Sequence, residues 1–238
     1  MISLVFIFAV IAEFMADFKT HIQVASLISG SAAGTLAWAE LVSLPESGLL
    51  WLAGSLGGIM PDIDADTSRS MRIIFRLFAT LATSLVLLYG RQYLSLPDTV
   101  LLGLVSYFGV RYPLSWGFAR LTVHRGSLHS LLANLVFAGI GVTISYRLFE
   151  LSPELAWWVG IFIFFGAVIH LLLDEMYSID LEGRRLKSSF GTAFKVMQWP
   201  ALLPNLALLG VLALCLWTGP SLTSLQLVLQ QLWPVSYI

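Results

Sequence analysis

The stretch LAWWVGIFIFFGAVIHLLL, residues 155–173, decides the class of fold, because its 19 residues include no charge and a single histidine, His170. A helix needs about 20 predominantly apolar residues to cross the roughly 30 Å hydrocarbon core of a bilayer. The stretch therefore predicts a transmembrane helix. Asp174 follows directly, so a histidine and a carboxylate lie about one helical turn apart at its end.

The composition of the whole chain supports a membrane protein. Of 238 residues, 58% are hydrophobic and 11% are charged. Soluble domains carry about 25% charged residues, so the composition excludes an ordinary cytosolic enzyme. The formal net charge of −1 gives no basic field that would attract nucleic acid. A single cysteine, Cys215, excludes an internal disulfide framework and a zinc site built from cysteines.

Other apolar stretches predict further helices. Five of them are long enough to predict spans, at residues 22–42, 73–90, 99–118, 128–147 and 201–217, and a shorter one at 48–60 predicts a short or broken helix. We therefore expect an all-α, polytopic transmembrane helical bundle with about six to seven spans. The long polar segment at residues 175–199 predicts a structured loop on the cytoplasmic side.

The same patterns predict the domain organisation. We expect one membrane-embedded domain over residues 15–217 and an interfacial amphipathic tail over residues 218–238, where glutamines alternate with leucines. Residues 1–14 form an apolar extension. It is interpreted either as an interfacial or partial helix or as sequence upstream of a true start at Met15.

The basic residues predict the orientation of the bundle. If the short helix counts as a crossing, 11 of the 13 lysines and arginines fall on the side where the first span begins. Only Arg91 and Arg147 fall on the other side. Cytoplasmic loops carry the excess of lysine and arginine, so the first side is expected to face the cytoplasm. All the histidines lie at span ends on that side: His21, His124, His129 and His170.

The first polar motif is His124-Arg125-Gly126-Ser127-Leu128-His129-Ser130. Five residues on a helix turn through about 500°, so the two histidines would not share a helix face. The Arg-Gly-Ser sequence between them predicts a turn, which can bring both imidazoles to one point. The alternative is a pair of surface histidines near lipid headgroups.

The second motif is Pro61-Asp62-Ile63-Asp64-Ala65-Asp66, in which carboxylates alternate along the chain. Such a segment can supply oxygen ligands to a divalent ion or to an adjacent pair of ions. Without the histidines, a solvated acidic loop would be the better interpretation. Asp66 is the member that could instead face water or balance Arg69.

His170 and Asp174 form the third motif, since residues i and i+4 share a helix face. They are interpreted as two metal ligands or as a histidine held by a carboxylate, and the alternative is a simple hydrogen bond at a helix end. His21 opens the first span and is a weak signal alone. Four imidazoles and several carboxylates without a thiolate suit zinc first, and also manganese or iron. The number of ligands allows more than one ion.

These motifs, with Asp17-Phe18-Lys19-Thr20-His21, resemble those of the YdjM-like family over roughly Met15–Lys195. The family consists of bacterial inner-membrane proteins described as metal-dependent hydrolases. The resemblance implies a divalent metal bound by this family's histidines and aspartates. In this sequence these are His21, Asp62, Asp64, His124, His129, His170 and Asp174. It implies no particular substrate.

We expect metal-assisted hydrolysis at the cytoplasmic face of the inner membrane. Asp64 or Asp66 would accept a proton from water, and Arg125 would hold a phosphate. This combination favours a phosphoester in a lipid or lipid-linked anionic substrate, with membrane lipids as the other partners. The alternative is non-enzymatic binding, sensing or transport of a divalent metal, and a purely structural scaffold comes third. The sequence leaves the oligomeric state open.

Overall fold

The computed structural model describes residues 18–64, 69–121, 126–177, 179–180, 185–186 and 195–232. These residues are almost entirely helical, which confirms the all-α class. The described strands, β1 (Ile179–Asp180) and β2 (Arg185–Leu186), have two residues each and pair in antiparallel fashion. The chain divides into two compact units, residues 1–61 with 127–238, and residues 62–126.

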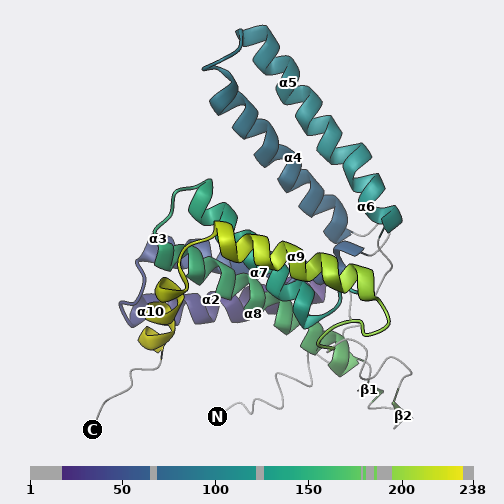
Figure 1. Ribbon diagram of the computed structural model, residues 1–238. Helices are drawn as coiled ribbons and strands as arrows, with labels where there is room; N and C mark the ends of the chain where they lie inside the picture. The colour runs from purple at the N-terminus through teal and green to yellow at the C-terminus, as the bar shows by residue number, and fades with distance from the viewer. Residues whose placement is uncertain are drawn as a thin grey trace. The chain divides into compact units, whose positions relative to one another are not determined.

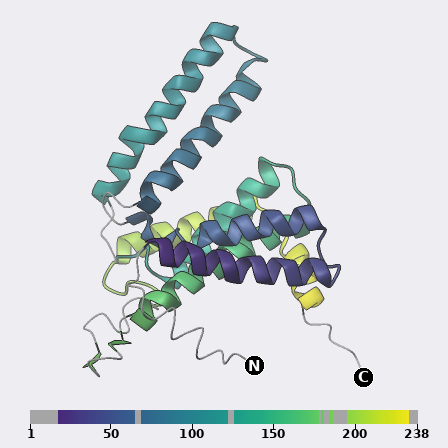
Figure 2. The ribbon, with the colours of Figure 1, turned by 180° about the vertical axis from the view of Figure 1, so that it is seen from behind.

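The larger unit is a helical bundle around one long helix (Figure 1). The central helix α8 (Pro153–Tyr177) packs against α2 (Phe18–Trp38), α3 (Leu44–Gly57) and α7 (Leu131–Arg147). Figure 2 shows α2 and α3 side by side. Two C-terminal helices complete the unit: α9 (Leu202–Thr218), which packs on α7, and α10 (Leu222–Leu232), which packs on α8.

Glycines allow α3 and α8 to approach closely. A Cβ built on Gly57 would lie 2.1 Å from the carbonyl oxygen of Ile163, and one built on Gly166 would lie 1.9 Å from the carbonyl oxygen of Gly54. Helices in membranes associate through such small residues, because lipid provides no hydrophobic drive between helices. The backbones of α3 and α8 are therefore in direct contact near the C-terminal end of α3.

Sequence signals at the helix starts correspond to observed caps. Ser43 and Glu46 form a capping box at the start of α3, with Pro45 in its first turn. Ser130 caps α7 through a bond from the Ala133 amide to its hydroxyl. The start of α7 is also fixed from outside, because the amides of Leu131 and Leu132 donate to the carbonyls of Lys195 and Val196.

The smaller unit is a helical hairpin. Helix α4 (Arg69–Gly90) packs against α5 (Leu96–Gly109), which continues through the π-helix η2 (Val110–Leu114) into α6 (Ser115–Leu121). Pro113 lies inside η2 and has no amide hydrogen, which accounts for the irregular turn there. Along the chain, the boundary between the two units falls within the 3₁₀ turn η1 (Pro61–Asp64), between Pro61 and Asp62.

Fewer helices than expected have the length and hydropathy of a membrane span. Two described helices qualify, Ser70–Gly90 and Pro153–Tyr177, and a third is reached if α9 and α10, bent by 90°, are one span. The expected span at 99–118 is divided by η2, while α7 and α9 have 17 residues each. Serines, glycines and two threonines lower the mean hydropathy of the 21 residues of α2. The helix of 48–60 is short, as predicted, with 14 residues in α3.

Candidate metal centre

Three histidines surround one carboxylate inside the larger unit. His21 lies in the first turn of α2, His129 directly precedes the Ser130 cap of α7, and His170 and Asp174 lie in the last part of α8. All four side chains are buried: His129 and His170 are 0% exposed, His21 is 3% exposed and Asp174 is 8% exposed. A buried carboxylate among imidazoles requires compensation by hydrogen bonds or by a cation.

The two oxygens of Asp174 have different neighbours. Oδ1 lies 3.1 Å from Nε2 of His21, which is a hydrogen-bond distance. Oδ2 lies 3.7 Å from Nε2 of His129 and 3.7 Å from Nε2 of His170. Those two separations are too long for hydrogen bonds. Asp174 is therefore oriented by His21 on one side and faces the other two histidines on the other.

The spacing around Oδ2 fits a metal site. Ligand atoms of His129, His170 and Asp174 all lie within 4.8 Å of one another. A tetrahedral ion with bonds of about 2.0–2.2 Å holds its ligand atoms roughly 3.3 Å apart. The observed 3.7 Å separations are close to that value. Imidazole and carboxylate donors also suit zinc, manganese and iron.

The backbone of α3 determines which nitrogen of His170 can bind a metal. Nδ1 of His170 lies 2.8 Å from the carbonyl oxygen of Gly58. A carbonyl only accepts, so Nδ1 carries the hydrogen and Nε2 of the neutral ring carries the lone pair. Metal-binding histidines commonly donate their other ring nitrogen in this way. The contact thus presents Nε2 of His170 to Asp174.

Ring packing and the cap of α7 fix the remaining orientations. The His21 and His170 rings stack with centroids 4.0 Å apart, and the His129 ring lies edge-on to His170 at 5.8 Å. Ser130, next to His129, donates its hydroxyl to the Ser127 carbonyl at 2.6 Å. The hydroxyl of Ser130 therefore holds the backbone before His129, through Ser127, and after it, through Ala133.

Within the described part of the larger unit, the structure brings together four of the seven predicted metal ligands: His21, His129, His170 and Asp174. Asp62 lies half-buried in η1 and belongs to the smaller unit. The side chain of Asp64 lies outside the described part of the structure. The same holds for the whole of three other predicted site residues, Asp66, His124 and Arg125, and for residues 1–14. The roles assigned to these residues stay predictions.

Two contributors to the site were not predicted. The carbonyl of Gly58 and the close approach permitted by Gly166 both act through the backbone. The available signal was a glycine one helical turn before His170, together with the Gly57-Gly58 pair at the end of the short apolar stretch. Glycines facing each other across two predicted helices indicate close backbone contact.

The sequence model of the YdjM inner membrane protein family matches residues 15–229. The chain belongs to this family. The match begins where the resemblance of the motifs begins, at Met15, and extends beyond Lys195 into α10. It therefore includes every residue of the candidate metal centre. No curated protein and no solved structure matches the chain.

Membership of the YdjM inner membrane protein family agrees with the apolar helices α4 and α8. Both observations support a protein embedded in the inner membrane. His129, His170 and Asp174 could together hold a metal ion, by their chemistry and spacing.

Proposed function

We propose that this protein is a multi-pass inner-membrane hydrolase that depends on a divalent metal. The observation that carries the proposal is the sharing of Asp174 Oδ2 between His129 and His170, at 3.7 Å from each Nε2 and buried within an apolar helical unit. Ionisable groups inside membrane proteins are costly and are therefore a sign of function.

In this proposal His129, His170 and Asp174 hold the metal, with zinc as the first candidate and manganese or iron as the others. His21 orients Asp174 by donating to Oδ1. A divalent ion bound there supplies a Lewis acid and an activated water. Asp62, Asp64 and His124 are proposed as further ligands, which allows a second ion.

The reacting groups are proposed from chain connectivity. Arg125 is four residues before His129, and Asp62 is four residues after Gly58, whose carbonyl holds His170. Four residues span at most about 14 Å, so the chain itself limits how far Arg125 can lie from His129 and Asp62 from Gly58. Asp64 or Asp66 accepts a proton from water, and Arg125 binds the phosphate of a lipid or lipid-linked phosphoester.

We also propose that the shorter helices lie in the membrane, giving six to seven crossings. Helices α7 and α9 have 17 residues each, the lower end of the range of about 17–25 that spans a bilayer. The end of α3 at Gly57 and Gly58 is buried in protein, which is the condition for irregular backbone at membrane depth. The bias of 11 basic residues against 2 supports a site at the cytoplasmic face.

Metal analysis of the purified full-length protein tests the centre. We expect wild-type protein to retain zinc and the variants His129→Ala and Asp174→Asn to lose it. The control Asp98→Asn, which removes an exposed carboxylate at the start of α5, is expected to keep it. Full metal retention by both site variants would overturn the metal centre.

A screen of phosphoester lipids with the metal-loaded protein tests the reaction. Turnover that is lost in Asp174→Asn and kept in Asp98→Asn supports a hydrolase. Bound metal without turnover on any ester class would favour the binding or sensing alternative. Uptake of radioactive divalent ions into vesicles would favour transport.

Cysteine labelling from the two sides of the membrane tests the orientation. In a Cys215→Ser background, Ser127→Cys lies next to the site, and Ser152→Cys lies in the loop between α7 and α8. We expect an impermeant reagent outside the inner membrane to label position 152 and not position 127. The reverse pattern contradicts a cytoplasmic site.

A further inference from the structure

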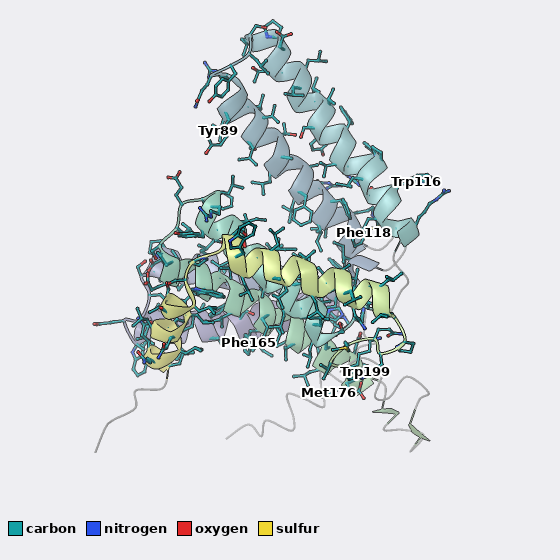
Figure 3. The ribbon with its side chains drawn as sticks, viewed as in Figure 1. Tyr89, Trp116, Phe118, Phe165, Met176 and Trp199 are labelled. Carbon is teal, nitrogen blue, oxygen red and sulfur yellow. The ribbon has the colours of Figure 1, made fainter. Side chains whose placement is uncertain are left out.

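The smaller unit presents aromatic rings on the outside of its second arm. Phe108, Tyr112 and Trp116 are 52%, 57% and 59% exposed. They follow one another at intervals of four residues, which places them along one side of a helix. Phe118, in contrast, packs on Phe75 of α4 with centroids 5.4 Å apart. Figure 3 shows Trp116 on the side of α6 that faces away from α4.

Two arginines lie on these rings. The guanidinium carbon of Arg120 is 3.9 Å from the centroid of the Trp116 ring, and that of Arg111 is 5.4 Å from the Tyr112 ring. Tyr112 also stacks on Phe108, with centroids 6.0 Å apart. A ring face attracts the cation but does not satisfy the five N–H donors of a guanidinium. Within residues 69–121, neither arginine side chain forms an ion pair.

The charge of the two arms of the hairpin, residues 69–121, is strongly one-sided. Between residues 69 and 121 the sole acidic residue is Asp98, which bonds Ser95 at the start of α5. The antiparallel packing of α4 on α5 puts Asp98 at the far turn of the hairpin, whereas Phe75 and Phe118 meet at the opposite end. Arg72 and Arg76, which flank Phe75 in α4, are exposed at that opposite end too. Among described residues 69–121, no acid forms an ion pair with Arg111 or Arg120.

We propose that Phe108, Arg111, Tyr112, Trp116 and Arg120 form a binding surface for the headgroups of anionic phospholipids. We call these five residues the arginine–aromatic face. Tryptophan and tyrosine are enriched at the level of the headgroups, where one end of the side chain is apolar and the other is wet. Guanidinium groups match phosphate in a bidentate manner, and an arginine already held on a ring loses less freedom on binding.

The arginine–aromatic face shares no residue with the candidate metal centre, since its residues belong to the other compact unit. The proposal therefore does not depend on metal binding or on hydrolysis. It commits to lipid as the partner because the face combines apolar rings with unneutralised cations along a helix of a membrane protein. A binding site for a soluble anion would need only the arginines, and the exposed aromatic rings would have no role in it.

The test uses the full-length protein in lipid nanodiscs that contain either brominated phosphatidylglycerol or brominated phosphatidylcholine as a minor component. Bromine quenches nearby tryptophan, so the contribution of Trp116 is the difference between wild type and Trp116→Phe. We expect quenching at Trp116 to require at least about fivefold less of the anionic lipid than of the zwitterionic lipid. Equal quenching by the two lipids would overturn the proposal.

The variant Arg111→Gln/Arg120→Gln should bring the two lipids to within about twofold of each other. Its control, Arg91→Gln/Arg147→Gln, removes two basic residues from the opposite side of the predicted topology and should keep the preference. A preference that survives in the first variant would overturn the assignment to these arginines.

A second measurement needs no variant. Raising the salt concentration from 0.05 to 0.5 M shortens the screening length from about 14 Å to about 4 Å. We expect the preference of the wild-type protein for the anionic lipid to fall several-fold. A preference that salt leaves unchanged would contradict a headgroup contact made through Arg111 and Arg120.

Discussion

His170 donates its Nδ1 hydrogen to the carbonyl oxygen of Gly58 at 2.8 Å, and this bond joins the end of α3 to the candidate metal centre. The bond is possible because Gly166, one turn earlier in α8, lets the α3 backbone approach. A side chain at position 166 would have to occupy the space of the Gly54 carbonyl. Helix packing and the orientation of a candidate ligand therefore depend on the same glycine.

Gly166→Ala should weaken both the fold and metal binding. The new Cβ would lie 1.9 Å from the Gly54 oxygen and 2.9 Å from the Gly58 nitrogen, so α3 must move away from α8. We expect a loss of stability of about 1–3 kcal/mol and zinc binding about 10–100-fold weaker. Thermal unfolding and competition with a zinc chelator measure the two effects.

The control for this substitution is Gly210→Ala in α9, where a Cβ would meet nothing within 4 Å. It is expected to be neutral or slightly stabilising, because alanine favours a helix over glycine by roughly 1 kcal/mol. Unchanged zinc affinity in Gly166→Ala would contradict the coupling between packing and ligand orientation.

Two serine caps should differ in their effect on metal binding. Ser130 caps α7 next to His129, whereas Ser43 caps α3 at the end remote from Gly58. We expect Ser130→Ala and Ser43→Ala each to lower stability by about 1 kcal/mol. Only Ser130→Ala should weaken zinc binding, because it releases the turn that holds His129. Isothermal titration with zinc measures the affinity of each variant, and the comparison is valid because the two variants are expected to be equally stable. Equal zinc affinities in the two variants would show that the cap does not position the ligand.

Asn134 should be replaceable by an apolar residue at no cost to the fold. Its side chain is 0% exposed, and neither amide atom has a hydrogen-bond partner among the described residues. Asn134→Leu is expected to stabilise the protein by about 1–3 kcal/mol or to be neutral, because it removes a buried polar group that lacks compensation. Unfolding in a mixed detergent series measures this change.

Asn205 provides the comparison for Asn134. It is also buried, but its amide nitrogen donates to the Gln198 carbonyl at 2.7 Å. Asn205→Leu should therefore be destabilising, because it leaves that carbonyl without its donor. A large loss of stability in Asn134→Leu would contradict the prediction. It would mean that the Asn134 amide does have a hydrogen-bond partner.

The places of the helices could be predicted from hydropathy, but their lengths could not. The uninterrupted apolar run before Asp174 became α8, because nothing within it stops a helix. The run at 99–118 has similar hydropathy, yet Pro113 converts its second half into a π-turn. The run at 22–42 became α2, in which Ser29 is buried and Gly30 lies against Trp51, so some of its small residues serve helix packing. Hydropathy averages do not distinguish these uses of small residues.

The candidate centre could be predicted in its chemistry and only partly in its geometry. His170 and Asp174 share a helix face by spacing alone, so this pair was predictable. The bonds that join Asp174 to His21 and His170 to Gly58 span 153 and 112 residues of sequence. Such contacts depend on tertiary packing, and the topology could predict only that the histidines lie on one side of the membrane. The backbone carbonyl of Gly58 carries no side-chain signal at all.

His21 should support the metal rather than bind it. The motifs predicted His21 as a ligand, but its Nε2 lies at hydrogen-bond distance from Asp174 Oδ1, while Oδ2 faces His129 and His170. We expect His21→Asn, which keeps a hydrogen-bond donor, to weaken zinc binding by about 10–100-fold, as for partners that orient a ligand. His129→Asn should abolish stoichiometric binding, because it removes a nitrogen that would contact the ion. Competition with chelators of graded affinity distinguishes the two, and complete loss of zinc in His21→Asn would return His21 to the ligand set.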